Sequence, residues 1–502
     1  MAPPSSSSHL STLPEYDAVP YVGSCYRITH PDHLHAVARL HGLPARPVEQ
    51  WRVLELGCAM GSNLLPMAAS LPEASFVGVD LGAEHIRMGQ DLARDAGLDN
   101  VHLHHASIAD VTPDWGVFDA VLCHGVFSWV PTPVQHHILR VSKENLAPTG
   151  VALISYNALP GWYDRLPARE FMRRLAGEGP PRQRVLNARN ALARLAMSVP
   201  KDDPQHEVLS RLDKSLTGMS DAYILHEYLS PENTPLHFDR FLDLAEEHGL
   251  NWLCEAAPLW GHTFDEHGQH LLDVSSAREW EARMDFMRNR MFRTTMLAHP
   301  AFGNDTRPHW TRLREGFQVS ASFALKDGRV GDEDEDAWLD VPEDLLSPLQ
   351  HLVKDHRRLW SLDELAATSE VDAEALGPLL MRIYRYGLLE LRDSPRRCQV
   401  SIQDPPEVRR YARSQARRGE SRVASRAHLQ VELEDLEVVL LPLIDGTRPI
   451  DELETAVLHI MSRGTYDPNW PGELLVSDKL RESVKDMLAT LLARLLNQGL
   501  LV

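Results

Sequence analysis

The sequence predicts an α/β protein in which a mainly parallel sheet is followed by a mainly helical C-terminal region. Between residues 49 and 163, short apolar segments of strand length alternate with amphipathic segments of helix length. Such alternation specifies right-handed βαβ units. From about Pro342, short helices with capping residues replace this pattern. With 502 residues, 43% of them hydrophobic, the chain can form several cores, and we expect roughly three folded units.

The N-terminal segment is expected to lack regular structure before a helical arm begins. Residues 1–15 contain a Pro-Pro and Ser-rich run with neither a basic start nor an apolar signal region. Residues 16–48 form the predicted arm, because Leu34, Val37, Ala38 and Leu40 have helical spacing. Gly42 and Pro44 then end that helix.

The predicted core spans residues 49–163. Its expected strands are 52–56, 75–80, 101–105, 118–123 and 151–156, and its expected helices are 64–70, 83–96 and 133–146. Residues 164–224 are rich in Arg, Leu and Ala and predict a helical insertion. Residues 225–300 resume the alternation, and their strand-like segments 251–255 and 291–299 are expected to complete the sheet.

Two helical units, 301–403 and 404–502, follow the sheet. Ser361 begins a capping-box pattern in the first. The units end in the related runs YGLLELR and QGLLV and resemble winged-helix modules. Acidic residues crowd the first unit, so we expect protein interaction here and regard nucleic-acid binding as disfavoured.

Charge and cysteine content restrict the partners and the compartment. The formal net charge is −20, and no long Lys/Arg block offsets it. This disfavours nucleic acid or an anionic membrane surface as the main partner and is compatible with a basic protein or peptide substrate. The five cysteines form no C-x-x-C pair, and no run of about 18 apolar residues occurs. We therefore expect a cytoplasmic protein; the sequence leaves a homodimer open.

The loop after the first strand carries the strongest chemical signal. Gly57-x-x-x-Gly61 joins that strand to a helix, and Asp80 ends the second strand. Glycine lets the backbone approach a ligand closely, and a carboxylate at the Asp80 position can accept both ribose hydroxyls of a nucleoside. The spacing lacks the third glycine of pyrophosphate-binding loops. The pattern therefore favours a nucleoside without pyrophosphate.

Five segments in this linear order resemble one family: VLELGCAMGSNLLPMA, FVGVD, CHGVFSWVP, SYNALPGW and LHEYLSPENTPLHF. The chain is similar to class I S-adenosylmethionine-dependent methyltransferases that carry a methyltransferase regulatory domain, a family that includes bacterial protein lysine methyltransferases. The arm and the run LLPLIDGTRPIDEL extend the similarity over nearly the whole chain. The resemblance implies a Rossmann-like core and S-adenosylmethionine as cofactor.

The resemblance also implies roles for individual residues. The cofactor loop runs from Glu55 to Gly61, with Glu55 and the backbone of Gly57, Cys58, Ala59 and Gly61 at the methionine part and Asp80 at the ribose. The adenine is expected against Ser107 and Ile108. Ser107 stands where many such enzymes have an acid, which leaves open whether a side chain or the backbone recognises the adenine amino group. His124, at the end of the fourth strand, contacts the methionine carboxylate, lines the acceptor channel, or is merely a satisfied polar residue.

Methyl transfer from a sulfonium is an in-line displacement, so the protein mainly aligns the acceptor and excludes water. A lysine acceptor, favoured by the resemblance, must first lose the proton that its pKa of about 10.4 retains. Aromatic and carboxylate residues near the cofactor are therefore candidates: Tyr16, Asp17, Tyr21, Tyr156, Asn157, His226 and Glu227. We favour Tyr16, Tyr21, Asn157 and Glu227 as catalytic, although each could simply pack or brace a helix.

Two other functions stay open. One is a methyltransferase acting on a peptide natural product or a small metabolite, whose core motifs would look the same. The other is a cofactor-sensing DNA-binding or scaffold protein.

The cluster of His102, His104 and His105 lacks Cys or carboxylate partners, so we expect a surface strand there and no metal site.

Overall fold

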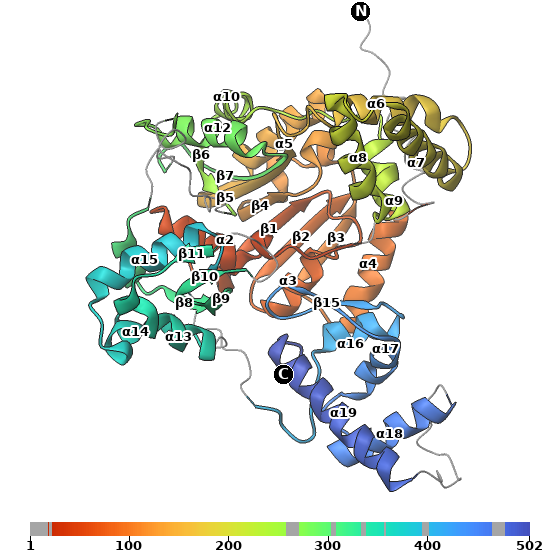
Figure 1. Cartoon of the computed structure of the whole chain (residues 1–502), viewed down its shortest axis with the longest axis vertical. Coiled ribbons are helices and arrows are strands. Elements are labelled where there is room, and N and C mark those ends of the chain that lie inside the picture. The colour runs from red at the N-terminus through yellow and green to blue at the C-terminus, as the bar shows by residue number, and fades with distance from the viewer. Residues whose placement is uncertain are drawn as a thin grey trace, which may run out of the picture.

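The computed structural model describes residue 19 and residues 23–257, 271–302, 308–332, 338–355, 358–393, 401–463 and 477–502. Its centre is a seven-stranded sheet in the order β3-β2-β1-β4-β5-β7-β6 (Figure 1). The strands are β1 Arg52–Leu56, β2 Ser75–Asp80, β3 Val101–His105, β4 Phe118–Cys123, β5 Leu146–Asn157, β6 Asn251–Glu255 and β7 Phe292–Ala298. The first five are parallel, and β7 is antiparallel to both neighbours. The predicted α/β fold is confirmed.

Helices cover both faces of this sheet. They are α2 Pro31–Leu40, α3 Leu64–Ser70, α4 Ala83–Ala96, α5 Thr132–Glu144, α10 Phe238–Glu247 and α12 Ala277–Arg288. Successive residues of β1 point to opposite faces, so Val53 packs in the cluster with α2, α3 and α4, and Leu54 in the cluster with α5 and α10. The strand order reverses between β1 and β4, which places a ligand-binding crevice at their carboxyl ends.

The segment between β5 and β6 contains a helical bundle. Its helices are α6 Leu166–Ala176, α7 Pro181–Ser198, α8 Pro204–Thr217 and the short α9 Asp221–Tyr223, followed by the π-helical turn η6 Ile224–Tyr228. They share a core of their own that includes Met172, Leu192 and Tyr228. Figure 1 shows this bundle at the upper right, beyond β1, β2 and β3.

The middle unit combines two small sheets with helices. Strands β8 Gln318–Ala321, β12 Trp360–Ser361 and β13 Leu389–Arg392 form one sheet, and β9 Ala324–Lys326, β10 Arg329–Gly331 and β11 Trp338–Asp340 form a second. The helices are α13 Leu346–Lys354, α14 Leu362–Ser369 and α15 Ala373–Arg385. Ser361 caps α14 by accepting from the Glu364 N–H, so the predicted helix start is confirmed. Leu40 of α2 enters the core of this unit, so the arm joins it to the sheet.

The C-terminal unit contains α16 Arg410–Arg417, β14 Arg422–Ala424, β15 Gln430–Glu432, α17 Asp435–Leu440, α18 Ile450–Arg463 and α19 Asp478–Asn497. Most of its apolar residues form a separate core. Tyr411 and Ala424 instead pack in the cluster of α3 and α4. This unit, blue in Figure 1, therefore docks directly on the helices that follow β1 and β2.

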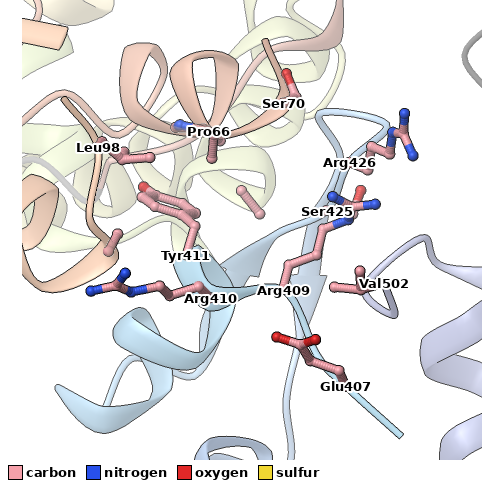
Figure 2. Close-up of a pocket in the computed structure, with 13 residues that line it drawn as sticks. Pro66, Ser70, Leu98, Glu407, Arg409, Arg410, Tyr411, Ser425, Arg426 and Val502 are labelled. Carbon is pink, nitrogen blue, oxygen red and sulfur yellow. The ribbon is translucent and has the colours of Figure 1, made fainter. Parts of the chain in front are cut away.

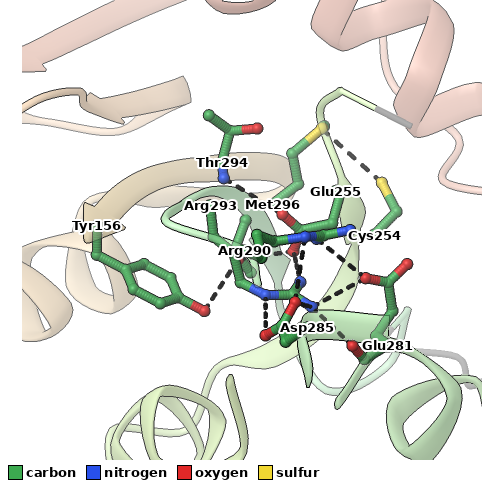
Figure 3. A network of polar contacts seen from close by, with 10 residues as sticks. Tyr156, Cys254, Glu255, Glu281, Asp285, Arg290, Arg293, Thr294 and Met296 are labelled. Carbon is green, nitrogen blue, oxygen red and sulfur yellow. Dashed lines mark hydrogen bonds and ion pairs between the residues drawn. The ribbon is translucent and has the colours of Figure 1, made fainter. Parts of the chain in front are cut away.

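A buried charge network supports the edge of the sheet (Figure 3). Arg293 on β7 is fully buried and lies 2.9 Å from Glu255 and 2.8 Å from Asp285. Glu281 lies 2.9 Å from Arg293 and 3.2 Å from Arg290. Burial of charge is unfavourable unless ions pair closely, as here.

Two sequence expectations bear on this region. Tyr156, a candidate for the mouth of the site, lies in the core, where its ring stacks on Phe241 at 4.1 Å; that expectation was wrong, because β5 is covered on both faces.

His102 and His104 lie on the exposed face of β3, and His104 packs on Trp115. Within the ranges that the structure describes, no helix is long and apolar enough to span a membrane.

Candidate functional site

The loop between β1 and α3 lies at the reversal of strand order. Gly57 has a φ of +77°, a conformation that favours glycine. A Cβ at this position would lie 2.6 Å from Cγ2 of Val126, in the loop after β4. Both features require glycine, because the Val126 side chain packs directly against the Gly57 backbone.

The N–H groups of this loop are used inside the protein. Those of Gly57 and Cys58 both donate to the Val79 carbonyl oxygen, at 2.8 and 3.1 Å. The Gly61 N–H donates to Cys58 O at 2.8 Å. These three residues can contact a ligand through carbonyl oxygens or close approach.

Asp80 organises the same loop. Its Oδ2 accepts from the Ala59 N–H at 2.9 Å, and its Oδ1 accepts from the Gly82 N–H at 2.8 Å. A carboxylate has about four acceptor sites. Each oxygen of Asp80 therefore retains capacity for one hydroxyl of a bound nucleoside.

Glu55 is buried at the end of β1. Its Oε1 accepts from Nδ2 of Asn63 at 2.7 Å, whereas its buried Oε2 has no hydrogen-bond partner among the described residues. Burial raises the pKa of Glu55 to about 7, more than the Asn63 hydrogen bond lowers it. An unpaired buried carboxylate oxygen is costly, and a ligand ammonium group would satisfy it.

The loop after β3 supplies an acid that the sequence pattern did not identify. Ser107 caps the turn Ile108–Asp110, and its N–H donates to Oδ2 of Asp110 at 2.9 Å. The carboxylate thus folds back to the position of Ser107. Ile108 is buried beside it and offers an apolar surface.

His124, after β4, lies between two aromatic rings. Its ring centroid is 4.3 Å from that of Tyr26 and 5.8 Å from that of Phe292. Burial lowers the pKa of His124 to about 4, so the ring is neutral at pH 7. The three rings form an aromatic surface next to the glycine loop.

Glu227 lies in the π-helical turn at the end of the bundle, a geometry that is frequent at functional sites. Burial raises the pKa of Glu227 to about 7, against the opposing charges of Arg165 and Arg169. The charges of Glu227 and Glu55 both raise the pKa of Tyr26, after burial. Tyr26 therefore lies within electrostatic reach of both carboxylates.

The other catalytic candidates have different places. The Asn157 side chain is buried and donates to Oδ1 of Asn233 at 2.9 Å. Nε2 of His226 lies 2.9 Å from the carbonyl oxygen of Val19 in the arm. Tyr16, Asp17 and Tyr21 lie outside the described residues.

Sequence reasoning missed Tyr26, Asn63 and Phe292. Tyr26 and Asn63 lie within segments whose resemblance to the family was noted, so a residue-by-residue reading of those segments offered a signal. Phe292 is an aromatic residue at the start of β7, and nothing in the local sequence indicated that it lies near the site.

Three family matches divide the chain. Residues 53–150 match the family described as "Methyltransferase domain". Residues 220–299 match "Predicted methyltransferase regulatory domain". Residues 404–500 match "PKMT, C-terminal winged helix domain".

Relatives from Rickettsia cover different shares of the chain. Uncharacterized protein RP789 of Rickettsia prowazekii is 39% identical over 295 residues, which are 57% of this chain and 52% of that protein. Uncharacterized protein RP028 of the same organism is 36% identical over 234 residues, which are 46% of this chain and 94% of that protein. The match thus spans about half of RP789 and nearly all of RP028.

The structure of PKMT2 from Rickettsia typhi superimposes with a TM-score of 0.84 at 25% identity, covering 96% of this chain and 100% of that one. The same protein in complex with AdoHcy gives a TM-score of 0.83 at 25% identity and the same coverage. The architecture, including both C-terminal units, is therefore shared.

Proposed function

We propose that this chain, which belongs to the family of methyltransferases with a regulatory domain and a PKMT-type C-terminal winged helix, transfers methyl groups to lysine side chains of proteins. It is an S-adenosylmethionine-dependent methyltransferase; the lysine acceptor is the proposal. PKMT stands for protein lysine methyltransferase, and the similarity to PKMT2 along the whole chain supports this acceptor.

The residues around the glycine loop fit S-adenosylmethionine. We assign the unpaired Oε2 of Glu55 to the ammonium group of the methionine part and Asp80 to the ribose hydroxyls. The close approach at Gly57, with Cys58, Ala59 and Gly61, accommodates the methionine chain. Ser107, with Asp110 behind it, and Ile108 are assigned to the adenine. When bound, this cofactor supplies a methyl group on a positively charged sulfur.

The single observation that carries the acceptor proposal is the electrostatic influence of Glu227 on Tyr26, a member of the aromatic surface formed with His124 and Phe292. A lysine ammonium group is attracted to aromatic faces such as Tyr26 and Phe292. A carboxylate with a pKa of about 7 can accept its proton at neutral pH. We therefore assign Glu227 as the base, and His124 as an uncharged wall of the channel.

Asn157 connects two segments near this site. Its N–H donates to Oγ of Ser128 at 2.9 Å, and its side chain donates to Asn233. It thereby joins the loop after β4 to the segment that follows Glu227. We assign it a positioning role, and no role in the proton transfer.

The location is also a proposal. Cys25, Cys58, Cys123 and Cys254 are free thiols. Free buried thiols fit a reducing compartment, so we propose the cytoplasm.

The test has two stages. Calorimetric titration of S-adenosylmethionine into wild type and Asp80→Ala should show binding that the variant loses; no binding to wild type would refute the cofactor assignment. Incubation with methyl-labelled cofactor and host lysate should then label protein, and mass spectrometry should find methylated lysine. Label confined to small molecules or peptides would instead favour a metabolite or natural-product enzyme, and binding without turnover a sensor.

A further inference from the structure

The C-terminal winged helix reaches the glycine loop through one buried histidine. His428 lies in the turn between β14 and β15, with a φ of +58° and an exposure of 1%. Its Nε2 lies 2.9 Å from Oδ1 of Asn63, 365 residues away in sequence. Since Nδ1 has no hydrogen-bond partner within the described ranges and an amide oxygen only accepts, Nε2 carries the proton and donates.

Asn63 connects this contact to Glu55. Its Oδ1 accepts from the Tyr26 N–H at 3.0 Å and from the His428 ring. The Thr29 hydroxyl also lies 3.0 Å away, but its single proton is donated over the shorter distance of 2.6 Å to the Tyr26 carbonyl oxygen. Nδ2 of Asn63 donates to Glu55. If the amide were flipped, its NH₂ group would face the Tyr26 N–H and its oxygen would face the Glu55 carboxylate. The Tyr26 N–H and Glu55 therefore fix the orientation of the Asn63 amide, and His428 supplies a second donor that holds its oxygen in place.

The docking of the C-terminal unit holds His428 in place. Figure 2 shows Tyr411 directed toward Pro66 and Leu98, with Ser425 and Arg426 on the neighbouring hairpin. The Arg410 side chain donates to the carbonyl oxygen of Asp95, in the last turn of α4, at 3.3 Å, and Arg418 pairs with the Asp95 carboxylate. The C-terminal unit thus meets α3 and α4 with apolar contacts of Tyr411 and Ala424 and with charged contacts of Arg410 and Arg418.

We propose that His428 is a positioning residue for cofactor binding, which holds the Asn63 amide so that Glu55 presents Oε2 to the cofactor ammonium group. The inference rests on the cofactor assignment above and adds a role for the winged helix. In this role the winged helix supports the cofactor site indirectly, because His428 contacts Asn63 and Asn63 contacts Glu55. A winged helix that undocks would remove one of the two donors to Oδ1 of Asn63 and weaken the site.

The test compares two variants of equal size in the intact protein. His428→Gln keeps an N–H donor near the position of Nε2, whereas His428→Met has similar bulk and no donor. Binding of S-adenosylhomocysteine, measured by calorimetry, should weaken on the order of tenfold in His428→Met, the value of about one hydrogen bond. His428→Gln should remain within about threefold of wild type.

Two controls separate positioning from general damage. Adenosine lacks the ammonium group, so its affinity should be equal in both variants. His459→Met replaces another buried histidine of the same unit, on α18, and should leave S-adenosylhomocysteine affinity unchanged.

Equal S-adenosylhomocysteine affinities for the Gln and Met variants, or an equal loss for adenosine, would overturn the role of His428. Both results leave the methyltransferase proposal intact. Wild-type protein that binds no S-adenosylhomocysteine would overturn both proposals. The ratio of the S-adenosylhomocysteine affinities of His428→Gln and His428→Met tests the proposal even if both variants are less stable than wild type.

Discussion

Gly89 in α4 and Met60 in the glycine loop are packed at backbone distance. A Cβ on Gly89 would lie 2.4 Å from the Met60 carbonyl oxygen and 2.6 Å from Cδ1 of Leu103. The loop therefore rests on the helix that follows β2, and its position depends on the absence of a side chain there.

Gly89→Ala is expected to destabilise the protein by about 1–3 kcal/mol, because the new methyl group collides with backbone. In an unobstructed helix the same change would stabilise by about 1 kcal/mol. Chemical denaturation measures the loss of stability. Cofactor titration measures affinity, which should also fall because the glycine loop is displaced. Gly218→Ala, at a site where a Cβ meets nothing within 4 Å, is the control. Unchanged stability and affinity in Gly89→Ala would contradict the packing.

Arg293→Met should be among the most destabilising changes in the core. It leaves Glu255, Glu281 and Asp285 without their shared cation, and breaking one partner of a buried ion pair costs about 3–5 kcal/mol. Arg278→Met is the matched control, since Arg278 pairs with three acids that are about half exposed. Exposed pairs contribute at most about 1 kcal/mol. Urea denaturation measures the free energy of unfolding of both variants. Equal losses of stability in Arg293→Met and Arg278→Met would contradict the prediction.

Glu227→Gln should lower kcat about 100-fold or more at neutral pH, the usual contribution of a general base. In wild type, the rate should rise with pH through about 7, as the Glu227 carboxyl loses its proton. The variant should lack that rise and retain its affinity for S-adenosylhomocysteine. Rate profiles from pH 5.5 to about 9 against a lysine-containing substrate test this. Glu207→Gln on the exposed side of α8 should keep the wild-type profile.

Glu55→Gln should make stability less dependent on pH. The folded-state pKa of Glu55 is about 7, against an ordinary value of 4.5. The unfolded chain therefore loses this proton first as pH rises, and wild-type stability falls between about pH 4.5 and 7, by about 3 kcal/mol at most. Below pH 4.5 Glu55 is protonated in both the folded and the unfolded state, so wild-type stability has not yet lost any of this free energy.

Thermal unfolding at pH 5 and pH 8 checks this assignment. The Tm of Glu55→Gln relative to wild type should be higher at pH 8 than at pH 5, while cofactor binding is weakened. A Tm difference that is the same at both pH values would show that Glu55 titrates normally.

Much of the core could be predicted because its signals are local. β1 to β4 appear at the predicted residues, since short apolar runs between turn residues specify strands. β7 is two residues shorter than the predicted segment 291–299. Gly57, Gly61 and Asp80 were identifiable because the turn after a first parallel strand needs glycine, and the end of the second strand faces the same crevice.

The exposure of individual side chains was less predictable. Tyr156 looked like a residue of the site, yet β5 lies between two other strands and beneath α10, so its ring is buried. The acid near the predicted adenine position is Asp110, three residues beyond Ser107, because a 3₁₀ turn folds it back. A strand or loop position in sequence does not say which neighbour covers it.

The sequence by itself determined the α/β core, the glycine loop, Asp80 and the winged-helix character of the C-terminal region, because periodicity and turn chemistry act over a few residues. Only the tertiary structure decided that the charges of Glu227 and Glu55 both raise the pKa of Tyr26, and that His428 donates to Asn63. The interactions of Tyr26 with Glu227 and of His428 with Asn63 join segments that are far apart in the sequence. They depend on how separately folded units dock, and docking is set by matching surfaces that no local pattern encodes.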